Sequence, residues 1–266
     1  MDSCEPPDMH DRPGAADASR HHAIEAIRRE LARLEGALLR DAGDRCPRQP
    51  AWRRVTPVES RRTAALAVVV AIGLQLALPD SLALVSRWLL PALELATLAA
   101  LLVAGPSGID PESRWLRAGS LGLIGLLSLA NAWSATLLVV GIITNRFGDQ
   151  AGPLLSTGAA IWLTNIIAFA IWYWELDRGG PAARAHARRL DADFLFVQMQ
   201  STDPHQLEWE PTFTDYLYLS FTNATAFSPT DVMPLTRWAK MLMLLQSLVS
   251  LTTVALVIAR AVNILH

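Results

Sequence analysis

Long runs of apolar residues, separated by short polar stretches, dominate the chain after residue 62. Several runs reach about 20 residues, the length that an α-helix needs to cross the hydrocarbon core of a bilayer. The pattern therefore predicts an all-α fold, a polytopic transmembrane helical bundle that occupies residues 63–266. We expect five spanning helices, at 63–78, 84–103, 118–144, 153–174 and 238–264.

The C-terminal fifth of the chain departs from a simple crossing pattern. An aromatic-rich segment at 213–221 is too short to cross a bilayer, and the turn-rich stretch Ser228-Pro229-Thr230-Asp231 follows it. Irregular backbone at membrane depth persists only where protein or a water-filled cavity surrounds it. We therefore expect a re-entrant, pore-like segment at 213–235, followed by a last helix at 237–264. Its candidate pore residues are Thr225, Ser228, Thr230 and Asp231.

The N-terminal region is polar and divides into three parts. Residues 1–18 are rich in Asp, Pro and Ala without periodicity, which predicts a disordered arm. Residues 19–42 predict an amphipathic helix, and residues 43–62 form a basic linker. The apolar stripe of the helix covers about two heptads, so we expect it to lie on the membrane or on a partner, with self-association as the alternative. The stripe consists of Ile24, Ile27, Leu31, Leu34 and Leu38.

Arginine residues indicate the orientation in the membrane. With five crossings, the basic linker, the loop with Arg114 and Arg117, and the loop after the fourth helix fall on one side. Basic loops stay cytoplasmic, so we expect a multi-pass protein of the bacterial plasma membrane with a cytoplasmic N-terminus and an external C-terminus. The re-entrant segment would then enter from the cytoplasm. The loop after the fourth helix contains Arg178, Arg184, Arg188 and Arg189, and Trp172, Tyr173 and Trp174 just before it predict an aromatic belt at the headgroups.

Two sets of polar residues within the predicted spans are candidates for chemistry. Glu94 lies near the middle of the second span, three residues after the helix-kinking Pro91, where a charged carboxylate costs about 2.5–3.5 kcal/mol. It is either a proton or cation site or a neutral acid bonded to a neighbouring helix. In the last span, polar residues within an arc of about 80° form either the lining of an aqueous path or an interhelical seam. These residues are Gln246, Ser250, Thr253 and Arg260.

Composition excludes several classes of function. The chain is 52% hydrophobic with a net charge of −2, which gives no indication of a nucleic-acid partner. Cys4 and Cys46 lack the spacing of a metal site and are interpreted as free thiols, and no histidine has a ligand partner at useful spacing. The sequence contains no hydrolase, zinc-protease or phosphate-binding motif. We therefore expect no enzyme activity, no cofactor and no metal.

Two family resemblances meet in the C-terminal part. The passage DYLYLSFTNATAFSPTDV and the long helix after it, with WLTN at 162–165 and WYWELDRGGP at 172–181, resemble an uncharacterised family of bacterial multi-pass membrane proteins. This likeness covers most of residues 60–266 and implies a membrane fold without a known activity.

Residues 215–263 also resemble a degenerate pore module of potassium channels. Four residues fall at matching places of the channel signature: Thr225, Asp231, Val232 and Pro234. Ser228 and Thr230, however, replace both filter glycines. The carbonyl ring of a potassium filter needs a backbone that glycine permits, so the resemblance implies a pore-like fold without potassium selectivity. Asp231 either caps the last helix or attracts a cation.

The leading functional expectation is channel-like or transporter-like permeation of a small ion, by a homo-oligomer if the re-entrant segment lines a shared axis. The alternative is a non-transporting membrane scaffold that presents its N-terminal helix to a partner. The lipid bilayer is the expected environment in both cases.

Overall fold

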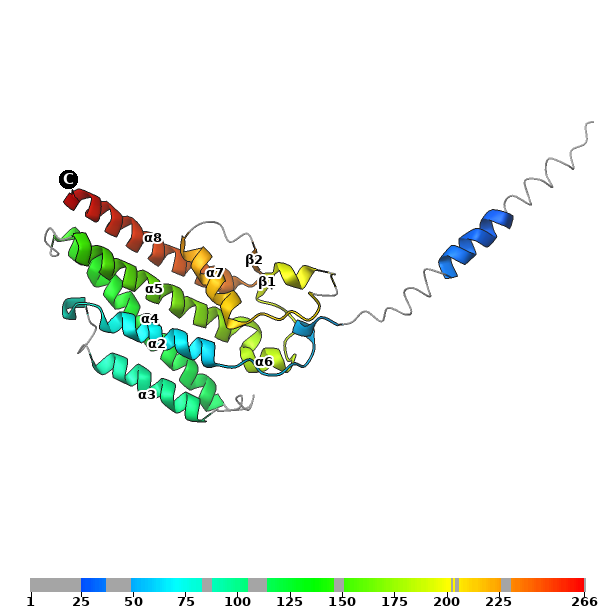
Figure 1. The fold of residues 1–266 in the computed structure, drawn as a ribbon, viewed down its shortest axis with the longest axis horizontal. Coiled ribbons are helices and arrows are strands. Elements are labelled where there is room, and N and C mark those ends of the chain that lie inside the picture. Colours follow the sequence, from blue (N-terminus) through cyan, green and yellow to red (C-terminus); the bar gives the residue numbers. More distant parts are fainter. Residues whose placement is uncertain are drawn as a thin grey trace, which may run out of the picture. The chain divides into compact units, whose positions relative to one another are not determined.

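The computed structural model describes residues 25–36, 49–82, 88–104, 114–145, 151–201, 203, 206–225 and 231–265. The chain forms two compact units, Met1–Arg48 and Gln49–His266. The described residues of the first unit form one helix, at 25–36 (Figure 1). The arm expected at 1–18, the ends of the expected helix at 19–24 and 37–42, and the start of the linker at 43–48 lie outside the described residues.

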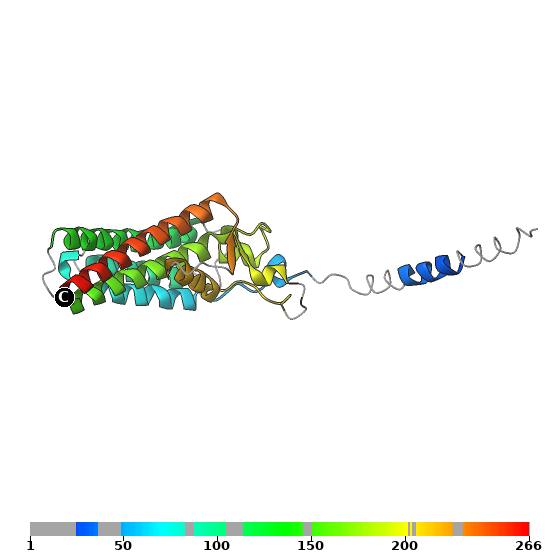
Figure 2. The same cartoon turned by 90° about the horizontal axis from the view of Figure 1, so that it is seen from above.

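The second unit is a bundle of long helices. Neighbouring helices in the chain run in opposite directions, and α5 lies in the middle, where it packs against α2, α4, α7 and α8 (Figures 1 and 2). In the most apolar 18-residue window of α5, 67% of the residues are buried, against 28% in α8, so α5 forms the core and α8 is peripheral. The long helices are α2 (Arg62–Leu76), α3 (Leu89–Ala104), α4 (Arg114–Ile143), α5 (Ala151–Leu176) and α8 (Arg237–Leu265).

Among the described residues, three helices are long and apolar enough to cross a membrane. The stretches are 117–143 within α4, 151–179, which covers α5, and 237–264 within α8. The all-helical fold and the membrane character expected from the sequence are therefore confirmed at this level. The shorter apolar helices α2 and α3 contain 15 and 16 residues. At 1.5 Å per residue they extend less than the roughly 30 Å of a hydrocarbon core. That the chain crosses the membrane five times stays a prediction.

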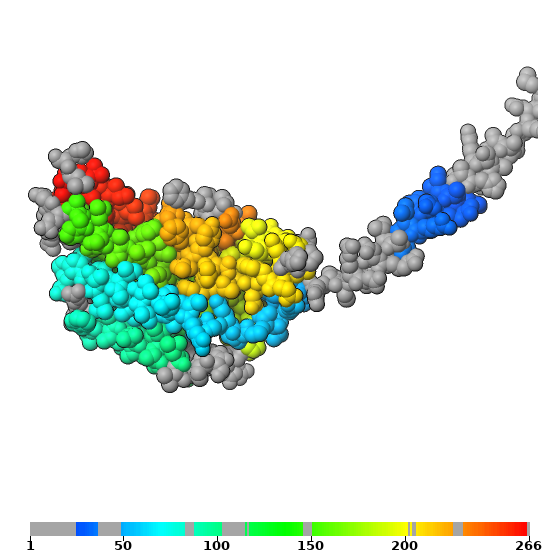
Figure 3. Space-filling view, viewed as in Figure 1, coloured from blue at the N-terminus to red at the C-terminus, as the bar shows by residue number. Residues whose placement is uncertain are grey.

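A polar cap covers one end of the bundle. We use this name for the described residues of 49–60 and 177–212, together with β2. The cap contains the short helices η1 (Ala51–Arg53), η3 (Asp177–Gly179), α6 (Pro181–Ala185) and η4 (Val197–Gln200). In Figure 3 the segment after residue 49, in blue, lies against the yellow part of the cap, where the Ala51 amide donates a hydrogen bond to the Leu207 carbonyl. At the other end of the bundle, η2 (Asp80–Leu82) follows α2.

A two-stranded antiparallel sheet ties the cap to the start of α8. Strand β1 (Phe194–Phe196) pairs with β2 (Val232–Pro234) in the register Phe194↔Pro234 and Phe196↔Val232. Both phenylalanines point into the core, where the Phe194 ring lies 5.1 Å from that of Tyr173 and the Phe196 ring 5.5 Å from that of Tyr216. The strand pair therefore returns the chain to the cap before α8 begins.

The short helix α7 (Phe213–Thr225) runs beside the second half of α5, in the opposite direction. Its first residue, Phe213, packs on Trp174 near the end of α5, whereas the Ser220 hydroxyl bonds the Ile166 carbonyl deeper in the bundle. The chain between α7 and Asp231, residues 226–230, lies outside the described part. Because β2 is back at the cap, the segment from α7 to β2 begins and ends at the same end of the bundle.

Candidate functional site

A tight reversal at the end of α5 organises the cap. Arg178, Gly179 and Gly180 have φ angles of 50°, 87° and 100°, all in the left-handed region. A Cβ atom on Gly180 would lie 3.0 Å from the carbonyl oxygen of Glu175, so glycine is required there by both conformation and space. Pro181 then starts α6 at its first position, which suits its fixed φ. The sequence DRGGP thus turns the chain back over the bundle.

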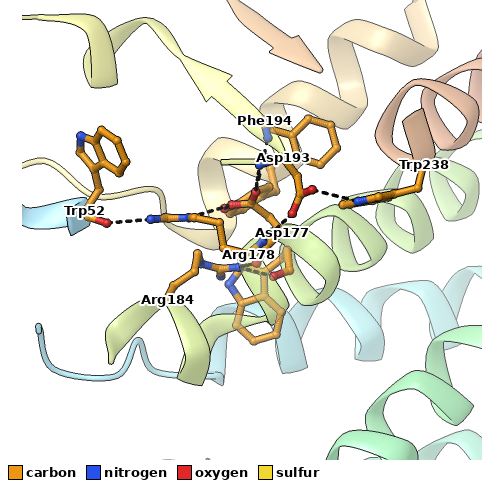
Figure 4. A network of polar contacts seen from close by, with 9 residues as sticks. Trp52, Asp177, Arg178, Arg184, Asp193, Phe194 and Trp238 are labelled. Atoms are coloured by element: carbon orange, nitrogen blue, oxygen red, sulfur yellow. Dashed lines mark hydrogen bonds and ion pairs between the residues drawn. The ribbon is translucent and has the colours of Figure 1, made fainter. Parts of the chain in front are cut away.

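Asp177 is the centre of a buried polar network (Figure 4). Its Oδ1 accepts hydrogen bonds from the backbone amides of Asp193 and Phe194, at 3.1 and 3.4 Å. Its Oδ2 accepts the hydroxyl of Tyr216 at 2.6 Å and lies 3.5 Å from Nε of Arg178. A fully buried carboxylate therefore joins the end of α5 to β1 and α7.

Asp193 extends the network to α8. Its Oδ2 accepts the backbone amide of Arg178 at 2.8 Å, and its Oδ1 accepts the indole N–H of Trp238 at 2.9 Å. Trp238 is the second residue of α8, and its ring also packs edge-on against Phe194 at 5.7 Å. The two aspartates consequently fix α5, α7, β1 and α8 against one another at one end of the bundle.

Arg178 and Arg184, which the sequence predicts to be loop charges, are buried in this network. Arg178 donates to the Trp52 carbonyl at 2.7 Å, and Arg184 donates to the Trp174 carbonyl at 2.5 Å and to that of Asp177 at 3.1 Å. Their exposed fractions are only 2% and 7%. They serve the packing of the cap, so only the exposed Arg188 and Arg189 of that loop act as surface charges.

A second buried network joins α5, α7 and α8 inside the bundle. The side chain of Gln246 accepts the Tyr173 hydroxyl at 2.6 Å and the Asn223 amide at 2.8 Å, and donates to the Ser220 hydroxyl at 2.7 Å. One turn further along α8, Ser250 accepts the Asn165 amide at 3.0 Å. Each of these groups has a protein partner and lies within the bundle.

The predicted stripe on the last helix is therefore placed in an interhelical seam rather than along an open path. Gln246, Ser250 and Thr253 are exposed by no more than 3%. Arg260 lies at the far end of α8, where it donates a hydrogen bond to the Asn145 side chain. The predicted aromatic belt is wrong, because Tyr173 and Trp174 face the interior and the Trp172 indole bonds Ser128.

The predicted pore-like residues are only partly described. Thr225 is half-buried at the end of α7, where its hydroxyl bonds the Thr222 carbonyl, and Ser228 and Thr230 lie outside the described residues. Asp231 is exposed, and its carboxylate accepts the Tyr218 hydroxyl at 3.3 Å. The capping interpretation of Asp231 is wrong, because β2 intervenes and α8 begins only at Arg237.

Glu94 lies fully buried on α3 and faces α2. Its Oε1 accepts the side-chain amide of Gln75 at a long 3.4 Å. Its Oε2 is also buried and has no hydrogen-bond partner among the described residues. A buried carboxyl oxygen without a partner is costly, and the contacts of Glu94 among the described residues do not account for its burial.

The linker before α2 is held to the bundle by Glu59 and Arg61. Glu59 accepts the Trp174 indole at 2.7 Å and the Phe213 amide at 2.8 Å. Arg61 donates to the Ser120 hydroxyl at 3.0 Å, and burial lowers the pKa of its guanidinium while the nearby Glu175 carboxylate opposes that shift.

In the described part of the chain, no group of three or more His, Cys, Asp or Glu side chains is arranged to hold a metal ion. Comparison with protein-family models, with curated proteins and with solved structures finds no match for this chain. The resemblances to an uncharacterised membrane family and to a pore module therefore stay expectations from the sequence.

Proposed function

We propose that the chain is an integral protein of the bacterial plasma membrane with five crossings and a cytoplasmic N-terminus. The alternating directions of α2, α3, α4, α5 and α8 support this topology, since successive long helices begin at opposite ends of the bundle (Figure 1). In this arrangement α7 is a re-entrant helix that enters from the cytoplasmic cap. The exposed Arg62, Arg117, Arg188 and Arg189 belong to the cap end, as expected of a cytoplasmic side.

Labelling of single cysteines tests the topology. In a background with Cys4→Ser and Cys46→Ser, an odd number of crossings places Ser3→Cys and His266→Cys on opposite sides of the membrane. We expect an impermeant thiol reagent to label His266→Cys in intact cells and Ser3→Cys only after lysis. Labelling of both positions from one side would contradict either the five crossings or the re-entrant α7.

The functional role that the geometry supports best is that of a membrane scaffold presenting its N-terminal helix to a partner protein. One observation carries this proposal: Ile27, Leu31 and Leu34 on the helix at 25–36 are 54–61% exposed, and no described residue of their unit covers them. An isolated helix of about 12 residues is marginal in water, so burial of its apolar stripe is needed for stable order. The polar side chains between α5, α7 and α8 are buried and hydrogen-bonded to one another. This arrangement fits a membrane anchor better than a channel.

Loss of the apolar stripe should abolish partner binding. Burial of one leucine contributes about 1.5–3 kcal/mol, so the double variant Leu31→Ser, Leu34→Ser should weaken binding at least about 100-fold. Arg28→Ser, on another face of the same helix, is the matched control and should bind nearly as wild type. The readout is the Kd between the full-length protein in nanodiscs and the protein that photo-crosslinks to residue 31. Equal affinity of all three forms, or no crosslinked protein, would reject the scaffold role.

The second candidate is permeation of a small ion. It is favoured by Glu94, whose buried Oε2 has no partner among the described residues. In the proposed topology this carboxyl lies within the membrane, where a path for ions or protons would need a polar group. In one chain the stripe of α8 is closed, so a path along Thr225 and Asp231 would require a homo-oligomeric axis.

A further inference from the structure

The apolar stripe of the helix at 25–36 has the spacing of a coiled-coil seam. Ile27, Leu31 and Leu34 follow one another at steps of four and three, and Ile24 and Leu38 continue the same steps in the sequence. Two apolar residues in every seven form a narrow seam, whereas a helix that packs on a broad apolar surface carries a third apolar position. In heptad notation Ile27 and Leu34 occupy position d, and Leu31 occupies position a. The stripe therefore has the width of one partner helix.

The charge of this helix does not favour a membrane surface. Its described residues contain three arginines and three glutamates, so their net charge is zero. Helices that lie on a membrane surface are rich in Lys and Arg on the polar face and carry Trp, Phe or Leu on the other. The helix at 25–36 contains no lysine, tryptophan or phenylalanine. A second protein helix thus fits the stripe better than a lipid surface.

Charged residues beside the seam distinguish the two directions in which a partner helix could run. Positions e and g flank the seam; Arg28 and Glu35 occupy position e, and Glu30 occupies position g. In a parallel pair of two copies, position g faces position e of the other helix, which sets Glu30 against Glu35, two like charges. In an antiparallel pair, position e faces position e, which sets Arg28 against Glu35 on both sides of the seam.

Arg28 and Glu35 are available for such pairs. Both side chains are exposed, and among the described residues neither forms an ion pair, whereas Arg33 pairs with Glu30 within the helix at 3.6 Å. The antiparallel register that joins Arg28 to Glu35 also sets Leu31 opposite Leu34. One two-fold axis therefore satisfies both charge pairs and the apolar layer, and two-fold symmetry is the commonest arrangement of protein homodimers.

We propose that the partner of the helix at 25–36 is the same helix of a second copy of this chain, in an antiparallel pair. This inference rests on the scaffold role proposed above and names its partner. Two heptads form only a weak pair in solution, but anchoring of both copies in one membrane raises their effective concentration. The residues at 37–48 are long enough to span up to about 40 Å, so the two membrane units need not touch.

Charge reversal at the two flanking positions tests the proposal. The full chain, labelled at His266→Cys in a background with Cys4→Ser and Cys46→Ser, is reconstituted in liposomes, and single-molecule photobleaching gives the dimer fraction as lipid is added. We expect wild type to dimerise. Arg28→Glu or Glu35→Arg should lower the association constant about tenfold, because each converts two attractive pairs into two repulsive ones. An equimolar mixture of the two variants should dimerise again, since each then meets opposite charges on the other.

Two further variants are controls. Arg29→Glu makes the same charge change at the adjacent position f, on the outer face of the helix, and should dimerise as wild type. The neutral Arg28→Ser loses the attraction without adding repulsion, so its association constant should stay within about threefold of wild type.

Stronger dimerisation of Glu35→Arg would indicate a parallel pair with Glu30, and a mixture that stays monomeric would indicate that no charge pair forms. Either result overturns the proposal, as does a loss in Arg29→Glu equal to that in Arg28→Glu. A monomeric wild type overturns it too, and photo-crosslinking from residue 31 then decides the scaffold role. A different protein crosslinked there leaves the scaffold role standing, whereas the absence of any crosslinked protein rejects both.

Discussion

Replacement of Asp177 by Asn is expected to destabilise the protein by about 3–5 kcal/mol. The Asp177 carboxylate is fully buried and lies 3.5 Å from the equally buried Arg178 guanidinium. Asparagine keeps one acceptor for the backbone amides of β1, but its NH₂ group would face two donors, the Tyr216 hydroxyl and Nε of Arg178. Removing one charge of a buried pair leaves the other uncompensated, which accounts for the size of the effect.

Unfolding in mixed micelles of rising denaturing detergent measures this change. Asp191→Asn, an exposed aspartate 14 positions along the chain in the same cap, is the control and should shift stability by less than about 0.5 kcal/mol. Tyr216→Phe removes one donor to the same carboxylate and should cost about 1.5–3 kcal/mol, the range for a hydrogen bond to a charged group. If Asp177→Asn unfolds at the same detergent concentration as Asp191→Asn, the network does not hold the cap.

The long helices could be predicted because their signal is local. A run of apolar residues marks a helix wherever it packs, so the expected spans at 153–174 and 238–264 differ from α5 and α8 by only one or two residues at each end. The short length of α7 followed from the aromatic segment at 213–221 and the turn residues after it. Each of these features is encoded within about 30 consecutive residues.

The cap could not be predicted in the same way. Its central carboxylate, Asp177, meets Tyr216 and the amides of Asp193 and Phe194, which are 16 to 39 residues away along the chain. In the sequence these residues look like an ordinary charged loop after a membrane helix, and Arg178 looks like a surface charge. The DRGGP turn was the available signal, since two glycines before a proline indicate a tight reversal.

The polar stripe on α8 shows what the helical spacing of polar residues can and cannot predict. Polar residues spaced by three, four and seven on one helix predict a common face, and the structure places Gln246 and Ser250 on such a face. Whether that face meets water or protein depends on the neighbouring helices. Here Ser220 and Asn223 of α7 and Tyr173 and Asn165 of α5 supply the partners, and no local pattern specifies that they do.

Replacement of Glu94 by Gln distinguishes the two proposed functions most sharply. Glutamine keeps the size of the side chain and an acceptor for the Gln75 amide, so the stability change should stay within about 1 kcal/mol. If Glu94 binds a permeating cation or proton, loss of its carboxylate should reduce flux into proteoliposomes about tenfold, which corresponds to about 1.4 kcal/mol of lost binding. If the protein is a scaffold, wild type and variant should both match protein-free vesicles.

The measurement is ion or proton uptake by vesicles that contain equal amounts of each protein. Glu208→Gln removes an exposed carboxylate of the cap and should leave any flux unchanged, which separates an effect at α3 from a general change in charge. Flux that falls with Glu94→Gln and persists with Glu208→Gln would support permeation and place the path beside α2 and α3 rather than along α8. Flux at the level of protein-free vesicles for all forms would reject permeation, because a buried carboxyl that moves no ion serves only the packing of α3 against α2.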